Sequence, residues 1–131
     1  MLYKTHNETD DINIDFTSLK GSIKTSYNNI LNKLGPSQKD FDNSKIDAEW
    51  TIEWEDGEIA TLYNWKNGRN YCGNYGDRIE DIIDWNIGGF NHDIVSRLHN
   101  ILNPNVFSTL TKLISTGLLA DSLLVEVPYD K

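Results

Sequence analysis

The sequence predicts a small α+β domain, in which an antiparallel sheet with a central β-hairpin carries two to three helices packed on its aromatic face. Three observations predict this class. Two segments carry apolar residues at helical spacing, one long segment alternates apolar and polar residues around an Asp-Gly turn, and another alternating segment follows it. A chain of 131 residues with 38% hydrophobic residues suits one domain better than two.

Residues 1–15 are rich in Asn, Thr and Asp and carry few apolar side chains. Such a segment cannot bury enough apolar surface to offset the entropy cost of ordering it. We therefore expect residues 1–15 to be a mobile acidic lead-in, and residues 16–131 to be a single α+β ligand-binding domain.

The first helix follows an extended piece at residues 19–24. Thr25 or Ser26 offers an N-cap, and Gly35 with Pro36 ends the helix. The apolar stripe between them consists of Tyr27, Ile30, Leu31 and Leu34. Residues 36–45 are polar without a period, which predicts a loop.

The hairpin is the clearest element, because apolar and polar residues alternate over residues 46–55 before Asp56-Gly57. A two-residue Asp-Gly turn predicts the pairs Glu55–Glu58, Trp54–Ile59, Ile52–Thr61, Trp50–Tyr63 and Ala48–Trp65. One face is then aromatic. The other carries Asp47, Glu49, Glu53, Glu55 and Glu58, which we interpret as a solvated surface, with a cation site as the alternative.

A long Gly- and Asn-rich loop at residues 67–77 comes next. A third strand is expected at about residues 81–87, with Ile83, Trp85 and Ile87 on one face and Gly88-Gly89 breaking it.

Asn91 then caps a helix that Asn103-Pro104 stops, with the stripe Ile94, Val95, Leu98, Ile101 and Leu102. A third helical segment is predicted from residue 106 to about residue 119, and the tail LLVEVP is expected as a short strand or a subunit contact.

The net charge and the cysteine content limit the classes of partner and the compartment that the protein suits. The formal net charge of -8 repels phosphates as a whole, so a nucleic acid polymer is a poor partner. A single cysteine, Cys72, excludes a disulfide within the chain and suits a reducing cytosol. No run approaches the ~18 apolar residues of a membrane span, so no membrane partner is expected.

The common catalytic and metal-binding motifs are absent from the sequence. His92 and His99 lie seven positions apart, wider than the spacing of zinc pairs. Cys72 could pair with a histidine as a nucleophile, but no family motif surrounds it, and a partly buried, inert thiol is the simpler interpretation. We therefore expect no enzymatic activity, no metal and no cofactor.

A binding site is predicted around the sequence WNIGGFN at residues 85–91. A strand that passes through Gly88 and Gly89 to the helix that follows Phe90 and Asn91 exposes backbone N–H groups and a positive helix end, which suit a phosphate. The alternative is a plain tight turn. All three arginines fall in the same central stretch, and tyrosines near it offer stacking surfaces. The candidate ligand-binding residues are Arg69, Tyr71, Arg78, Gly88, Gly89, Phe90 and Asn91.

The runs AEWTIEWEDGEIATLYNWK at residues 48–66 and WNIGGFN at residues 85–91 resemble small phage proteins, and the family is the phage Thoeris anti-defence family. The helix TSYNNILNKLGPSQ at residues 25–38 also fits that pattern, and the resemblance covers about residues 19–102. It implies a sponge in the host cytoplasm that sequesters glycocyclic ADP-ribose, and in some members cyclic oligonucleotides, without cleaving them. It also implies a homo-oligomer, dimeric or hexameric, and places ligand contacts at Gly88, Gly89 and Asn91.

Two other functions remain open from the residues alone. The row of carboxylates and the net charge of -8 are also typical of an acidic inhibitor that mimics DNA and blocks a host nuclease. An enzyme acting on nucleotides or sugars is the third possibility, although the sequence offers no evident general base.

Overall fold

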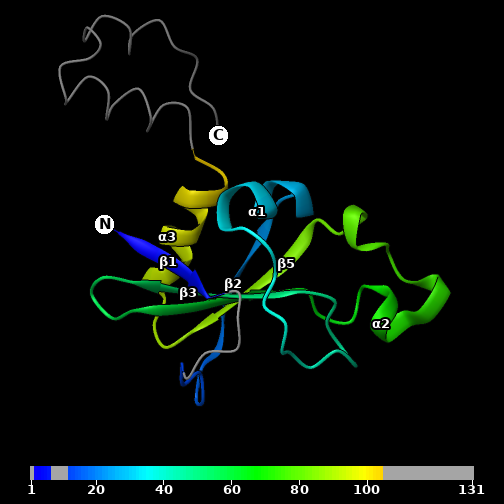
Figure 1. Ribbon diagram of the computed structural model, residues 1–131, viewed down its shortest axis with the longest axis horizontal. Helices are drawn as coiled ribbons and strands as arrows, with labels where there is room; N and C mark the ends of the chain where they lie inside the picture. Colours follow the sequence, from blue (N-terminus) through cyan, green and yellow to red (C-terminus); the bar gives the residue numbers. More distant parts are fainter. Residues whose placement is uncertain (1, 7–11, 105–131) are drawn as a thin grey trace, which may run out of the picture.

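The computed structural model describes residues 2–6 and 12–104 and contains one five-stranded antiparallel sheet with the strand order β1-β3-β4-β5-β2. In chain order the elements are β1 (Tyr3–His6), β2 (Ser18–Lys24), α1 (Tyr27–Leu34), β3 (Glu49–Trp54), β4 (Ile59–Tyr63), α2 (Arg69–Cys72), η1 (Gly73–Tyr75), η2 (Ile79–Asp81), β5 (Asp84–Gly89) and α3 (Asp93–Leu102). Helices α1 and α3 lie on the same side of the sheet, whereas α2 projects beyond its end (Figure 1). The predicted α+β class is confirmed. The helix expected at about residues 106–119 and the tail lie outside the described residues.

Helix α1 begins and ends where the sequence indicates, whereas the N-cap of α3 is His92, one residue after the predicted Asn91. Ser26 is the N-cap of α1, and its hydroxyl accepts a hydrogen bond from the N–H of Asn29 at 3.0 Å. Gly35 ends α1 with φ at +83°, a backbone conformation that favours glycine. The predicted stripe of α3 is buried at Ile94, Leu98 and Leu102, one residue per turn.

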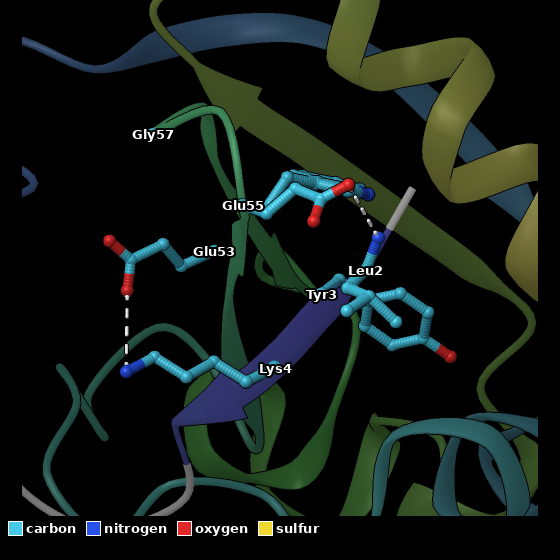
Figure 2. Close-up of a pocket in the computed structure, with 7 residues that line it drawn as sticks. Leu2, Tyr3, Lys4, Glu53, Glu55 and Gly57 are labelled. Carbon is cyan, nitrogen blue, oxygen red and sulfur yellow. Dashed lines mark hydrogen bonds and ion pairs between the residues drawn. The ribbon is translucent and has the colours of Figure 1, made fainter.

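Strand β1 corrects the expectation of a mobile lead-in, because residues 3–6 belong to the sheet. Tyr3 pairs with Trp54 and His6 pairs with Thr51 along the edge of β3. Figure 2 shows Lys4 opposite Glu53, where Lys4 Nζ lies 3.7 Å from Glu53 Oε1. A polar segment can therefore be ordered by backbone pairing and by cross-strand ion pairs, without burying much apolar surface of its own.

The hairpin register differs by one residue from the prediction. Trp50 pairs with Leu62 and Ile52 with Ala60. The loop has three residues instead of two: the N–H of Trp54 donates to the carbonyl of Glu58 at 2.9 Å, and Gly57 adopts φ +89°. Since neighbouring residues of a strand face opposite sides, this shift moves Tyr63 from the core face of the sheet to the other face.

Strand β5 begins and ends later than expected. Ile82 is fully buried, whereas Ile83 is 53% exposed, so the predicted inward alternation of Ile83 is wrong. Gly88 and Gly89 do not break the strand either. Gly88 pairs with Thr61 and Leu19, and Gly89 pairs with Ala60 and Ser18, which places both glycines between β4 and β2.

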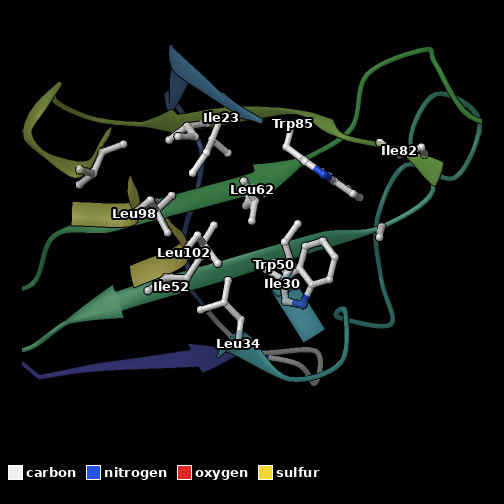
Figure 3. Close-up of a cluster of buried hydrophobic side chains, with 14 of the residues drawn as sticks. Ile23, Ile30, Leu34, Trp50, Ile52, Leu62, Ile82, Trp85, Leu98 and Leu102 are labelled. Carbon is white, nitrogen blue, oxygen red and sulfur yellow. The ribbon is translucent and has the colours of Figure 1, made fainter. Parts of the chain in front are cut away.

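Two buried tryptophans dominate the core between the sheet and the helices (Figure 3). The rings of Trp50 and Trp85 meet edge to face at 5.6 Å between centroids. The indole N–H of Trp50 donates to the carbonyl of Gly35 at 2.9 Å, and that of Trp85 donates to the carbonyl of Thr25 at 3.0 Å. Each end of α1 is thus tied to the sheet by one indole.

Replacing either of these tryptophans by phenylalanine should therefore destabilise the fold. Trp50→Phe or Trp85→Phe removes the indole N–H, leaves a carbonyl without its partner and opens a small cavity, so we expect a loss of about 2–3 kcal/mol in the free energy of unfolding. Urea denaturation followed by circular dichroism measures this loss. The control is Trp65→Phe, at a position that is 46% exposed, which should cost less than about 1 kcal/mol. Equal losses at all three positions would contradict the role assigned to the buried pair.

Candidate functional site

The candidate site residues taken from the sequence do not form one cluster. Arg69 and Tyr71 lie in α2 and Arg78 precedes η2, so all three lie before β5 begins. Phe90 and Asn91 follow the other end of β5. A six-residue strand is about 20 Å long. The two groups are accordingly at opposite ends of the strand, and α2 lies far from α3 in Figure 1.

Gly88 and Gly89 face opposite sides of the sheet. A Cβ on Gly89 would lie 2.9 Å from Ile94 Cγ1 and 3.0 Å from the carbonyl oxygen of Ile59, so this glycine lets α3 pack closely on the sheet. A Cβ on Gly88 would lie 2.6 Å from the hydroxyl of Thr61, on the face away from α3. Of this dipeptide, Gly88 alone reaches a groove.

The start of α3 already has its own polar partners. The side-chain oxygen of Asn91 accepts from the N–H of Asp93 at 2.9 Å, and Asp93 places a carboxylate in the first turn. Negative charge at this helix end is favourable for the helix, and it opposes a phosphate at the same place. Asn91 thus lies one residue before the N-cap, His92, and its side chain accepts the first N–H of the helix. Phe90 is 47% exposed beside it.

Two of the three arginines bind carboxylates of the same chain. Arg78 Nε lies 3.2 Å from Asp81 and 3.9 Å from Glu80. Arg97 donates to both oxygens of Asp56, at 3.0 and 2.7 Å, and its guanidinium lowers the pKa of Asp56 to about 2. Arg69 is exposed on α2. The arginines therefore do not form the common phosphate clamp that their spacing in the sequence indicated.

A shallow hollow of about 360 Å³ lies beside β1, next to the hairpin turn (Figure 2). Lys4 pairs with Glu53 in it, and the N–H of Leu2 donates to Glu55 Oε1 at 3.3 Å. Because its charged groups already have partners and its volume is the smaller of the two, this hollow is the weaker candidate.

A larger groove of about 620 Å³ lies across the sheet from the core. Strands β3, β4 and β5 contribute its floor, and the start of β2 and two loops contribute its walls. The lining residues are Ile14, Thr17, Ser18, Leu19, Gln38, Asp40, Phe41, Asp42, Ile46, Glu49, Thr61, Tyr63, Trp65 and Gly88. A volume of this size suits a small organic ligand.

Glu49 is the titratable group of this groove whose pKa changes most. Burial, and after it the nearby charge of Asp42, raises the pKa of Glu49 to about 7. Its Oε2 accepts a hydrogen bond from Gln38 Nε2 at 3.0 Å. Gln38 is itself held by the hydroxyl of Thr51, which donates to Gln38 Oε1 at 2.8 Å. Burial and the same Glu49 charge also raise the pKa of Tyr63.

This arrangement corrects the expectation of a fully solvated acidic face. Glu49 is half-buried, and Asp47 accepts from Asn64 Nδ2 at 2.8 Å and from the N–H of Asn70 at 3.2 Å. Glu53 binds Lys4 and His6. The described residues also contain no group of three His, Cys, Asp or Glu side chains placed to hold a metal ion, so the cation site gains no support.

An aromatic and basic rim adjoins the Glu49 groove at Trp65. The Nζ atoms of Lys45 and Lys66 lie 5.6 and 5.4 Å from the ring centroid of Trp65, and Lys66 Nζ lies 5.1 Å from that of Tyr71. Trp65 is 46% exposed and Tyr71 is 52% exposed, so each ring remains partly accessible to solvent. Tyr71 is thus one predicted site residue that reaches this region, together with Gly88.

The backbone at this rim is held in an uncommon conformation. Lys66 has φ at +59°, which is rare outside glycine and usually needs support from neighbouring contacts. Its N–H donates to the carbonyl of Lys45 at 2.9 Å, and its carbonyl accepts from the partly buried thiol of Cys72 at 3.2 Å. The buried amide of Asn64, just before Trp65, binds the backbone of Asp47 at 2.7 Å. These contacts fix Trp65 and Lys66 in place.

Sequence reasoning missed Gln38, Lys45, Glu49 and Lys66 as site residues. Glu49 was assigned to a solvated row because the loop at residues 36–45, which covers it, carries no periodic signal. The lysines were passed over because they are scattered along the chain. The Asp-Gly turn was the available signal for the groove, since a three-residue turn would have placed Glu49 and Tyr63 together.

No protein-family model matches the chain, and no curated protein matches it at a significant level. The resemblance to the phage Thoeris anti-defence family therefore remains a prediction from the residues quoted above. Within residues 2–6 and 12–104, no helix has the length and apolar character needed to cross a membrane.

Glu49 should make stability depend on pH. Its pKa is 4.5 in the unfolded chain and about 7 in the fold, so between these values the folded protein keeps a proton that the unfolded chain releases. Stability from this group accordingly falls as the pH rises through that window, and the loss is complete above about pH 7. Glu49→Gln removes the titration and should raise the free energy of unfolding by about 1 kcal/mol near pH 8, and by less near pH 5.

Urea denaturation at several pH values measures this difference. Glu80→Gln, which changes an exposed carboxylate on η2, is the matched control and should keep the pH dependence of the unmodified protein. If Glu49→Gln also keeps that pH dependence, the assignment of the raised pKa to Glu49 is wrong.

Proposed function

We propose that the protein binds a small phosphate-bearing nucleotide in the Glu49 groove and holds it without cleaving it. The observation that carries the proposal is the continuity between the groove and the rim. At one end, the side chains of Glu49 and Gln38 carry a carboxyl group and an amide group. At the other end, Trp65 lies beside the ammonium groups of Lys45 and Lys66. A nucleotide has a base, a sugar and a phosphate, and each has a matching surface here.

Each part of this site contributes a recognisable interaction. Stacking of a base on an aromatic ring is worth about 1–3 kcal/mol, and Tyr63 and Trp65 both line the groove. Lys45 and Lys66 supply compact positive charges suited to phosphate oxygens. The carboxylate of Asp42 suits the hydroxyl groups of a ribose, as acidic residues do in dinucleotide sites. The acidic and basic groups lie at different places, so a local positive region survives the net charge of -8.

In this proposal the protein acts in the host cytoplasm as a phage or viral anti-defence sponge for a cyclic nucleotide signal. The resemblance of residues 48–66 and 85–91 to the phage Thoeris anti-defence family supports that role, and glycocyclic ADP-ribose is the signal that it implies. Capture without cleavage needs tight binding and no catalytic group. The same resemblance supports a homo-oligomer.

The alternative, an acidic inhibitor that mimics DNA, gains less support from the fold. Asp47, Glu53 and Asp56 all bind groups of the same chain, and Glu49 lies in the groove. These carboxylates are therefore not an unoccupied row that matches the phosphates of DNA.

A capture assay tests the proposed function directly. The purified protein is incubated with glycocyclic ADP-ribose or with cyclic oligonucleotides, the free ligand is quantified, and the protein is then heated to release what it holds. We expect depletion of at least one ligand and its recovery unchanged on heating. If none is depleted, the proposal fails, and recovery of an altered ligand would indicate an enzyme instead.

Variants at the rim test where the nucleotide binds. Trp65→Ala removes the stacking surface, and Lys66→Asn removes a charge while keeping a residue that tolerates positive φ. Each should weaken capture by about tenfold or more. Arg78→Ala is the control, because Arg78 pairs with Asp81 and does not line the groove. This variant should bind the ligand as well as the unmodified protein does. A loss confined to Arg78→Ala would instead place the site near η2.

A further inference from the structure

Glu49 lines the groove, and one of its two carboxyl oxygens is bound by another side chain of the protein. Its Oε2 accepts from Gln38, whose two N–H bonds go to Glu49 Oε2 and to the carbonyl of Asp40, at 3.0 and 2.8 Å. Oε1 of Glu49 has no hydrogen-bond partner among the described residues, and no buried side-chain oxygen in them is unsatisfied, so this atom is accessible. Gln38 thus positions Glu49 and has no N–H left for a ligand.

We propose that Glu49 reads the Watson–Crick edge of a purine base, selecting guanine when its carboxyl group is ionised and adenine when it is protonated. The inference rests on the proposed function, because it assumes that the base of the bound nucleotide enters the groove. Beyond the proposed function, the inference specifies that the base is a purine and that Glu49 selects between adenine and guanine.

Hydrogen-bond chemistry gives each form a different partner. An ionised Oε1 only accepts, which matches guanine, because N1–H of guanine is a donor. A protonated Oε1 donates, which matches adenine, because N1 of adenine is an acceptor. Because the N–H of Gln38 occupies Oε2, the proton of the neutral form is favoured on Oε1, the accessible oxygen.

The groups around Glu49 make both forms accessible near neutral pH. The loop at residues 36–45 brings Asp40 and Asp42 toward it, and β4 brings the hydroxyl of Tyr63. The other wall consists of Ile14, Thr17, Ser18 and Leu19, and the floor of β5 adds Gly88, so neither brings a charge. The Lys45 and Lys66 side chains lie at the Trp65 rim. Burial, and after it the charge of Asp42, raises the pKa of Glu49.

The experiment compares 3′,5′-cyclic AMP and 3′,5′-cyclic GMP by titration calorimetry at about pH 5.5 and about pH 8. We expect the ratio of the two dissociation constants to move toward adenine by at least about tenfold at the lower pH. Glu49→Gln carries an amide that donates and accepts at every pH, so it should prefer cyclic AMP at both values, with no pH dependence. Glu53→Gln, on the same face of β3 and outside the groove, should behave as the unmodified protein.

The outcomes separate this inference from the proposed function. A protein that depletes nucleotides in the capture assay but shows one fixed ratio at both pH values overturns the base reading alone. A Glu49→Gln variant with the native pH dependence overturns it as well. A protein that takes up no nucleotide in either assay overturns the base reading and the proposed function together. Circular dichroism of each variant confirms that the fold is retained.

Discussion

The attachment of α1 to the sheet by two indole N–H groups is the constraint on which the rest of the structure depends. Trp50 comes from β3 and Trp85 from β5, with β4 between them, so the pair spans the centre of the sheet. Asn29 extends the attachment, because its amide donates to the carbonyl of Leu102 at 2.7 Å and so joins α1 to the end of α3. Among the described residues, both helices lie on this face (Figure 1) and the larger groove lies on the opposite one.

The predictable part of the fold is the part that local chemistry decides. Ser26, Gly35 and Asn91 act at helix ends through contacts a few residues away, and the sequence contains those contacts. The hairpin register is different, because two- and three-residue turns can both use Asp-Gly. Because the turn has three residues, the pairing of β3 with β4 is shifted by one residue from the prediction, and Tyr63 lies on the groove face. Edge strand β1 was missed for a related reason, since pairing along an existing sheet needs little hydrophobic signal.

The candidate site was less predictable, because residue type does not reveal a side chain's partner. Arginines favour phosphates, yet Arg78 and Arg97 bind Asp81 and Asp56, which are acidic residues of the same chain. The opposite holds for Glu49. A glutamate in an alternating strand is normally solvated, and a loop without periodicity covered this one. Tyr71 and Gly88 were found from the sequence, but the groove between their two regions depends on contacts between distant segments.

Gly88 and Gly89 have a consequence for how this protein can vary. One glycine faces the groove and the next faces α3, so at this point a single peptide unit separates the groove from the core. A side chain at the first position would take volume from the groove, and one at the second would push α3 away from the sheet. At this point only the backbone of Gly88 and Gly89 lies between the groove and helix α3. The missing side chains of the two glycines thus keep the groove open on one face and let α3 pack closely on the other.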